Sequence, residues 1–494
     1  RMQCFTKILP LMLLGVVVFG CGGSGSAAEV ECINDVCPCN EAGVRAAIAF
    51  GGGPYTFDCA EPTRVTLGTE LVIENDVILD GGGNLTLDGN QQRRVFSVPR
   101  GVTAELIELN ITKGRATEEH GGGIRNEGTL TLLESTVSEC SAGRESGCRT
   151  DDASLLCSEG GAIWNAGSLT LMDTSIVDST AHFGGGLANR DGVLVVVDSE
   201  IRGNSAAGCR GPGGIVCSGG GGIWNSAELM VMNSVVSQSA ADWGAGIYTR
   251  RTFTMTDSAV FENTAGFDGG GILDFDSLEI VDSTVADNIA GQSGGGIANQ
   301  AGLLELNGTT LSGNIAAAAG GAVFNPAAAD AALVNSTVSG NEAETGGAVY
   351  NEGSLLLTSC TLAANNASAG TALFDVGTPG ASPRLIRSTL IDGDCGGEPF
   401  GSDGFNIESP GDTCGLDQPS DQTSAGALGI EALDDNGGPT QTHALRQSSV
   451  AVDAIPEPEC VDLDGQPMIA DQRGSARPAG ASSACDVGAF ELQP

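Results

Sequence analysis

Positive charge is scarce in this sequence, with 22 Lys and Arg against 62 Asp and Glu and a formal net charge of −40. So strong an acidic excess disfavours nucleic acid and anionic lipid as partners. Histidine is scarcer still, because only His120, His182 and His443 occur and none lies in a nucleophile or zinc motif. Few residues are therefore available for acid–base or nucleophilic chemistry, which favours a non-catalytic protein without a cofactor.

Long hydrophobic runs are also absent. The longest, Ile8–Phe19, has 12 residues, which is too short to span a bilayer but typical of the hydrophobic region of a signal peptide. We therefore expect residues 1–20 to be a signal peptide of the lipoprotein type. Residues 21–60 then form a Gly- and Ser-containing flexible tether followed by a Cys-rich segment.

The end of this leader, Val18-Phe19-Gly20-Cys21, resembles the lipobox of bacterial lipoproteins. The resemblance implies that Cys21 carries a lipid and that the protein is anchored at the outer membrane of a bacterial envelope. Contact with the membrane is then made through the lipid alone. The alternative is an ordinary secretory leader that is cut near Ala28, which makes the protein a secreted one.

Aromatic residues make up only 4% of the chain, whereas Gly occurs 75 times and recurs at a regular interval. One phrase repeats between residues 124 and 349: small residues, an aliphatic residue, any residue, and usually Asn. Most intervals are 24 to 26 residues, and two longer ones, of 39 and 36, hold insertions. A period near 25 is typical of a solenoid. The aliphatic anchors are Ile124, Ile163, Leu187, Ile223, Ile247, Ile272, Ile297, Val323 and Val349.

Each repeat contains three short apolar pieces with Gly, Asn, Asp and Ser between them. In one repeat these pieces are Gly270–Asp274, Leu278–Asp282 and Ser283–Asn288. Apolar residues alternate with others over three to five positions, which indicates strands. Three short strands per coil predict an all-β fold, a parallel β-helix over residues 61–390.

Two segments resemble known families. Residues 339–343 with 346–349 are similar to repeats of the chlamydial polymorphic outer membrane proteins, and residues 434–491 are similar to the choice-of-anchor Q domain. The resemblance implies a right-handed β-helix at a bacterial surface, without enzymatic activity. We expect residues 391–494 to form the second module and to close the stack of coils. Its motifs are Asp435–Leu445, Ala451–Ala454, Asp471–Gly474 with Arg477-Pro478, and Cys485–Glu491.

Removing Cys4 and Cys21 from the 16 cysteines leaves 14, an even number that favours disulfides in an oxidising compartment. Each insertion holds one close pair, so we expect each to be a loop stapled by its own disulfide. For Cys32, Cys37, Cys39 and Cys59, a zinc site is the alternative to disulfides, and Cys140 and Cys360 have no assigned partner. The predicted disulfides are Cys148–Cys157, Cys209–Cys217, Cys395–Cys414 and Cys460–Cys485.

Equivalent residues of stacked coils form ladders with a spacing of about 4.8 Å. The Asn two residues past each anchor is expected to face inward and to be structural. A second ladder lies between the second and third strands, where Asp and Asn are expected to cap turns. Calcium between Asp173 and Asp198, or between Asp257 and Asp282, is a further hypothesis for this ladder. Its members are Glu134, Asp173, Asp198, Asn233, Asp257, Asp282, Asn307 and Asn335.

The residue between each anchor and its Asn is expected to point outward, and this column is rich in aromatic residues. Such a stripe can stack on sugar rings or hold an extended peptide. The alternative is that the stapled insertions fold back over Trp164 and Trp224 and bury them. The predicted ligand-contact stripe consists of Trp164, Trp224, Tyr248, Phe324 and Tyr350.

Together these features predict a non-catalytic bacterial envelope or surface lipoprotein. Its β-helix is expected to serve adhesion or glycan contact, with a glycan or another cell-surface ligand as partner. The alternative is a carbohydrate-active β-helix enzyme, either a polysaccharide lyase or a glycosidase. Such an enzyme needs clustered carboxylates, or an Arg or Lys beside acidic ligands, on one sheet face, and no such cluster is evident in the sequence.

Overall fold

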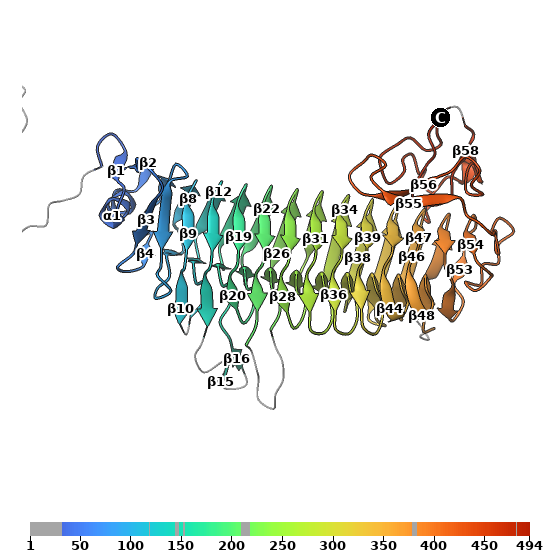
Figure 1. Ribbon diagram of the computed structural model, residues 1–494, viewed down its shortest axis with the longest axis horizontal. Coiled ribbons are helices and arrows are strands. Elements are labelled where there is room, and N and C mark those ends of the chain that lie inside the picture. The colour runs from blue at the N-terminus through green and yellow to red at the C-terminus, as the bar shows by residue number, and fades with distance from the viewer. Residues whose placement is uncertain are drawn as a thin grey trace, which may run out of the picture.

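The computed structural model describes residues 32–117, 119–143, 148–151, 154–208, 218–377, 383–480 and 482–494. These residues form a parallel β-solenoid of about 13 turns, seen as a long rod in Figure 1. The predicted signal peptide, Cys21 and the first part of the tether lie outside the described residues. Within the described part, no helix is long and apolar enough to cross a membrane.

Four parallel sheets run along the rod: sheet A with 15 strands, sheet B with 14, sheet C with 13 and sheet D with 10. One coil contains β33 (Ile272–Asp274) of sheet C, β34 (Ser277–Val281) of sheet A, β35 (Thr284–Ala286) of sheet B and β36 (Ile289–Ala290) of sheet D. The all-β parallel solenoid is therefore confirmed, but three strands per coil is wrong for these coils. Strands of sheet D have two to four residues, too few for an alternating pattern to show in the sequence.

Parallel pairing extends beyond residues 61–390 at both ends. At the N-terminal end, β2 (Gly52–Asp58) belongs to sheet A, and α1 (Glu41–Phe50) buries Val44 and Ile48 against the common core. At the other end, β54 (Ile407–Ser409) is the last strand of sheet B. The helix covers the first end of the stack, and the residues around Phe400 and Leu416 cover the last, where unpaired strands would favour aggregation.

Disulfides occur near both ends of the described chain. Cys395–Cys414 and Cys460–Cys485 are confirmed near the C-terminal end. The four N-terminal cysteines also form disulfides, so the zinc alternative is wrong, because a disulfide sulfur is not a thiolate ligand. The predicted Cys209–Cys217 pair lies outside the described residues. The other disulfides of the described residues are Cys32–Cys37, Cys39–Cys59 and the predicted Cys148–Cys157.

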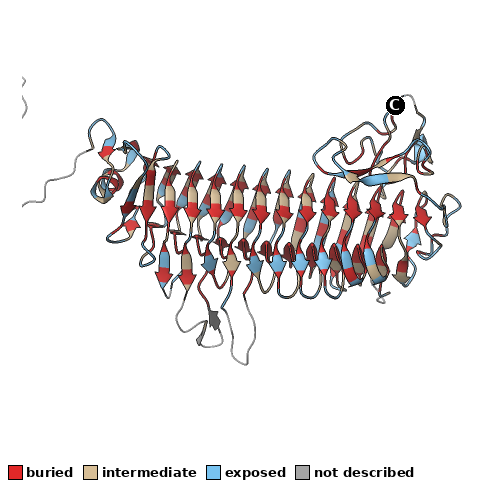
Figure 2. Cartoon of the chain, viewed as in Figure 1, coloured by how far each residue is buried: buried red, intermediate tan, exposed pale blue. Residues whose placement is uncertain are grey.

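Inside the rod, aliphatic side chains of the four sheets form one continuous core, and buried positions line the coils along its length in Figure 2. The predicted Asn ladder lies beside this core, on the inner face of sheet C. Asn126 Nδ2 donates to Asn165 Oδ1 at 2.7 Å, and Asn165 and Asn189 donate to the next coil at 2.8 Å. The inward, structural role expected for this ladder is therefore what the structure shows. Its Asn members are Asn126, Asn165, Asn189, Asn225, Asn299, Asn325 and Asn351, all at most 1% exposed.

Two neighbouring coils have another residue where the ladder has Asn. Thr249 continues it, because its hydroxyl accepts from Asn225 Nδ2 at 3.0 Å. Asp274 does not: it is 0% exposed, and no other side chain of the described residues donates to its carboxyl oxygens. The Oδ1 atom of Asn299, which pairs with Asp274 in sheet C, also lacks a partner there. Burial raises the pKa of Asp274 to about 7, and the backbone N–H groups of Asp276 and Phe275 oppose this rise.

Two more buried ladders, which we did not predict, occupy the turns on either side of sheet B. One is formed by Asn residues, the other by Ser and Thr residues whose hydroxyls accept from backbone N–H groups of the preceding coil. Cys140 and Cys360 stand at ladder positions, and burial raises the pKa of each thiol to about 12. Both therefore pack as small buried residues. The Asn members are Asn204, Asn263, Asn288, Asn314, Asn341 and Asn365.

The C-terminal residues do not close the stack as one module. Phe400, Cys414 and Leu416 join the solenoid core and cover its end, whereas the chain from residue 430 onward lies back along the outer face of sheet B (Figure 1). Gln472 exchanges hydrogen bonds with Thr310 and Thr337 there. His443 is buried at the same contact, with Nε2 2.9 Å from Ser339 Oγ.

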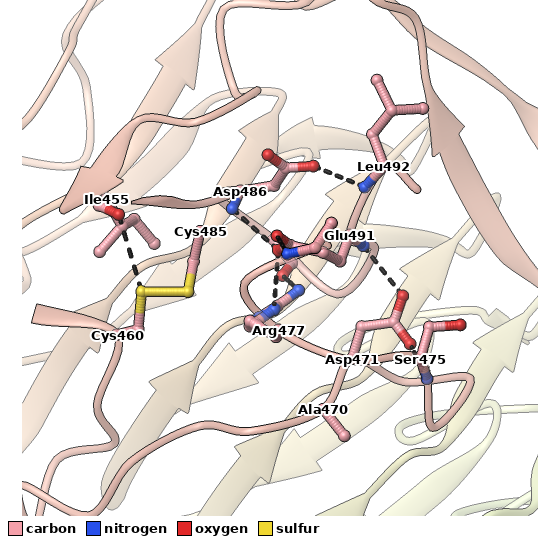
Figure 3. A network of polar contacts seen from close by, with 12 residues as sticks. Ile455, Cys460, Ala470, Asp471, Ser475, Arg477, Cys485, Asp486, Glu491 and Leu492 are labelled. Carbon is pink, nitrogen blue, oxygen red and sulfur yellow. Dashed lines mark hydrogen bonds and ion pairs between the residues drawn. A yellow bond between two sulfur atoms is a disulfide. The ribbon is translucent and has the colours of Figure 1, made fainter. Parts of the chain in front are cut away.

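A buried polar network holds this C-terminal part together (Figure 3). The fully buried Arg477 places Nε 3.2 Å from Glu491 Oε2, and Glu491 Oε1 accepts from the backbone N–H of Ala479. Asp471 accepts from the Glu491 backbone, and Asp486 accepts from that of Leu492. The separate motifs noted in the sequence, 471–474, 477–478 and 485–491, thus meet in space.

Candidate functional site

The predicted stripe is one column on the outer face of sheet C. Register places Trp224 of β25 (Ile223–Asn225) beside Tyr248 of β29 (Ile247–Thr249), and Phe324 of β41 (Val323–Asn325) beside Tyr350. Trp164, on β17 (Ile163–Asn165), has Ala188 as its neighbour on the next coil. The structure therefore brings the predicted residues into line.

Two members of the stripe are nearly covered. Trp224 is 5% exposed and Tyr248 7%. The ring of Phe183 lies 5.8 Å from that of Trp224, and the Arg190 guanidinium lies 5.3 Å from its centroid. These covering side chains come from a neighbouring coil. Residues 144–147, 152–153 and 209–217 of the insertions lie outside the described part of the chain.

Trp164 is held in a charged cluster. Its Nε1 donates to Glu159 Oε2 at 3.0 Å, and Arg190 Nη1 pairs with Glu159 Oε1 at 2.9 Å. His120 stacks on Trp164 at 5.4 Å, and Arg125 lies 5.5 Å from the centroid of the indole. Burial raises the pKa of Glu159, and the attraction of Arg190 opposes this rise.

At the other end of the stripe the rings stack on one another. Phe324 and Tyr350 lie 5.4 Å apart at 16°, and Tyr350 and Phe374 lie 5.6 Å apart at 3°. Stacked rings present their edges to solvent, whereas a sugar packs on a ring face. The repeat of about 4.8 Å brings such rings together, so the sequence contained this signal. Sugar stacking on this stripe therefore gains no support from the geometry.

The carboxylate ladder lies at the turn between sheets A and B, and we call it the acidic ladder. Asp173, Asp198 and Asp257 have φ of 49°, a left-handed conformation that Asn and Asp tolerate best. Asn307 was assigned to this ladder wrongly: it pairs with Val281 within sheet A, and Gly308 takes the turn position. The left-handed backbone therefore explains why Asp, Asn and Gly occupy this turn, without the need for a catalytic or binding role.

The acidic ladder offers few ligands for calcium. Asp173, Asp198 and Asp257 are exposed, and within the described residues no three His, Cys, Asp or Glu side chains gather into a group that can hold a metal ion. Ca²⁺ takes six to eight oxygen ligands, and one pair of neighbouring carboxylates supplies at most four. The calcium hypothesis for Asp173–Asp198 and Asp257–Asp282 therefore stays a prediction.

A third surface, on the outer face of sheet A, was missed by our sequence reasoning. Strands β18 (Ser168–Met172), β22 (Val193–Val197) and β26 (Glu228–Met232) are neighbours. Their outward residues are largely apolar, and Met172 and Val193 are 38% and 37% exposed. The signal was present in the outward positions of the second strand of each repeat. We call this surface the sheet A strip: Met172, Val193, Val195, Val197, Met230 and Met232.

Comparisons with known proteins do not identify the chain. No family model matches the sequence, and no curated protein matches it. Among solved structures, the pectate lyase Pel9A is similar, with 12% sequence identity, a TM-score of 0.34, and coverage of 91% of this chain and 90% of that one. The resemblances to polymorphic outer membrane protein repeats and to the choice-of-anchor Q domain stay expectations from the sequence.

Proposed function

We propose that this chain is a non-catalytic bacterial envelope or surface protein that uses its β-solenoid for adhesion. The sheet A strip carries the proposal. Six apolar side chains lie together on three neighbouring strands, exposed or half-buried, where an ordinary solvated face would carry polar residues. Three of the seven methionines of the chain are among them, and Met side chains adapt well to a partner surface.

We place the contact on the sheet A strip and not on the aromatic stripe, because the two surfaces differ in how their side chains are packed. Most rings of the stripe pack against Phe183, Arg190, His120 or another ring of the column. Among the described residues, no aromatic ring or Arg side chain is seen to pack on the strip on sheet A, and Met172 and Val193 each keep over a third of their surface exposed. A polypeptide partner that buries apolar surface suits the strip better than a sugar does.

An array of immobilised glycans and extracellular polypeptides, probed with residues 32–494, tests the proposal. The variant Met230→Thr/Met232→Thr is expected to lose binding at least about tenfold. Thr is the natural residue at the same two columns on the next strand, β30 (Phe253–Thr256), so the fold is expected to persist.

The matched control is Ile289→Thr/Ile315→Thr, which removes two exposed apolar side chains from neighbouring strands of sheet D. Binding by this control is expected to stay within about twofold of wild type. Equal loss in both variants, or no loss in either, contradicts the assignment of the contact to sheet A.

One observation favours the carbohydrate-active enzyme as a second candidate function. Glu159 is a buried carboxyl with a raised pKa, and it contacts both Trp164 and Arg190 in a cluster with His120. A lyase raises ultraviolet absorbance on a polyuronate, and a glycosidase releases reducing ends. Either signal, if abolished by Glu159→Gln, overturns the non-catalytic proposal.

A further inference from the structure

The sheet A strip and the acidic ladder run side by side along the rod. Met172 is followed directly by Asp173, Val197 by Asp198, and Met232 by Asn233. Because successive coils rise by about 4.8 Å, an apolar column and a polar, largely anionic column lie in parallel over several coils. Two open hollows of about 460 and 360 Å³ on the sheet B side are lined by Asp173 and Asp198, and by Asp257 and Asp282.

The acidic ladder has no cations of its own among the described side chains. None of its carboxylates forms an ion pair there, although Arg residues elsewhere in the described chain pair with Asp and Glu. Burial raises the pKa of Asp282, and the charge of Asp257 adds to this rise. A second copy of a chain with net charge −40 would add like charge to this edge, so it is a poor occupant.

We propose that the occupant is a basic amphipathic helix of a partner protein, lying along the rod. The inference rests on the proposed adhesive function and names the chemistry of its partner. The apolar face of the helix packs on Met172, Val197 and Met232, and Lys or Arg side chains beside that face reach the acidic ladder.

The turn of an α-helix and the coil of the solenoid advance by similar distances. A helix advances about 5.4 Å per turn, and a solenoid coil rises about 4.8 Å, so the mismatch over the three strands of the strip is about 1 Å. Apolar residues at i, i+4 and i+7 of the helix can therefore each meet one coil.

A synthetic peptide of about 18 residues, with Leu on one helical face and Lys beside it, is the probe. Its affinity for residues 32–494 is measured by fluorescence anisotropy. Met230→Thr/Met232→Thr and Asp173→Asn/Asp198→Asn are each expected to weaken binding at least about tenfold. Asn suits the left-handed turn, as Asn233 shows at the same ladder, so the second variant keeps the backbone.

Two controls separate the strip from general attraction to an acidic protein. Asp178→Asn/Asp287→Asn removes the same charge from left-handed turn residues between sheets B and D, and Ile289→Thr/Ile315→Thr removes apolar surface from sheet D. Both are expected to stay within about twofold of wild type. A peptide with Glu in place of Lys is expected not to bind.

The outcomes are distinct. If Asp178→Asn/Asp287→Asn weakens binding as much as Asp173→Asn/Asp198→Asn does, attraction is unspecific and the inference fails. If the Leu/Lys peptide does not bind, but array binding still depends on Met230 and Met232, the adhesive function stands and the helical partner is wrong. Melting curves of all four variants that match the wild type would show that unfolding does not cause the loss of binding.

Discussion

The Asn ladder inside sheet C and the acidic ladder at the turn between sheets A and B both repeat once per coil, with short polar side chains. In the first, each amide is buried and donates to the next, as Asn325 Nδ2 does to Asn351 Oδ1 at 2.8 Å. In the second, Asp198 and Asp257 are exposed, and their shared property is a left-handed backbone. The difference teaches that one repeat can select similar residues for hydrogen bonding in the interior and for backbone conformation at the surface.

The largest effect is expected when a buried amide is removed. Asn325→Ala removes the donor to Asn351 Oδ1 and to the carbonyl of Ser354, and it takes one of two acceptors from the amide of Asn299. It is expected to lower the free energy of unfolding by about 3 kcal/mol. Asp198→Asn in the acidic ladder is expected to change it by less than about 0.5 kcal/mol. Urea titrations of both variants test the contrast, and equal effects would remove burial as its cause.

A smaller effect, of opposite sign, is expected at the interruption of the Asn ladder. Because the pKa of Asp274 is raised to about 7 from its ordinary value of 3.8, the stability gained by binding a proton is complete below about pH 4 and is lost as the pH rises through 7. Asp274→Asn, which restores the amide, is expected to stabilise the protein by about 2 kcal/mol at pH 8 and hardly at all at pH 4. Melting curves across this range measure it.

Asp375 is the matched control for Asp274. It stands at the same ladder position at the C-terminal end, where it accepts from Asn351 Nδ2 at 2.7 Å and pairs with Arg384. Asp375→Asn is therefore expected to destabilise the protein by about 1 kcal/mol at pH 8. Stabilisation by both substitutions would show that pairing does not separate the two aspartates.

Within the acidic ladder a still smaller effect is expected. Burial and the charge of Asp257 both raise the pKa of Asp282. The contribution of this carboxyl to the stability of the fold is therefore lost as the pH rises through its folded pKa. Asp257→Asn is expected to return about 0.5 kcal/mol near pH 7 at low salt and nothing at high salt. A gain that persists at high salt would point to packing, not charge.

Calcium is expected to have the smallest effect. Because neighbouring carboxylates supply too few oxygens for an all-protein site, the melting temperature with added calcium is expected to lie within about 2 °C of that with a chelator. A larger rise with calcium, lost in Asp257→Asn/Asp282→Asn, would instead establish the calcium site between those two residues.

Much of the solenoid was predictable from local pattern. The anchors, the inward Asn column and the outward aromatic column follow from period-two alternation, which is a property of each strand. Sheet D was missed because β36 and its neighbours have too few residues to show a period. The pairing of Cys32 and Cys39 with partners nearby was left open, since spacing alone does not choose between a metal and a disulfide.

The candidate site was less predictable, because exposure is not a local property. Trp224 is outward in its strand, as expected, yet Phe183 and Arg190 from the preceding coil cover it. Met230 is outward by the same rule and keeps contact with solvent. Nothing in the two strand patterns separates these cases.

By itself, the sequence determined the coil: its period, its inward and outward positions, and the turn residues that tolerate a left-handed backbone, since these depend on neighbours a few residues away. Only the tertiary structure decided which outward face stays free. Gln472 meets Thr310 and Thr337 across more than 130 residues of sequence and covers sheet B, whereas no described segment covers the sheet A strip. Contacts between residues so distant in sequence leave no periodic signal, so exposure had to be read from the folded chain.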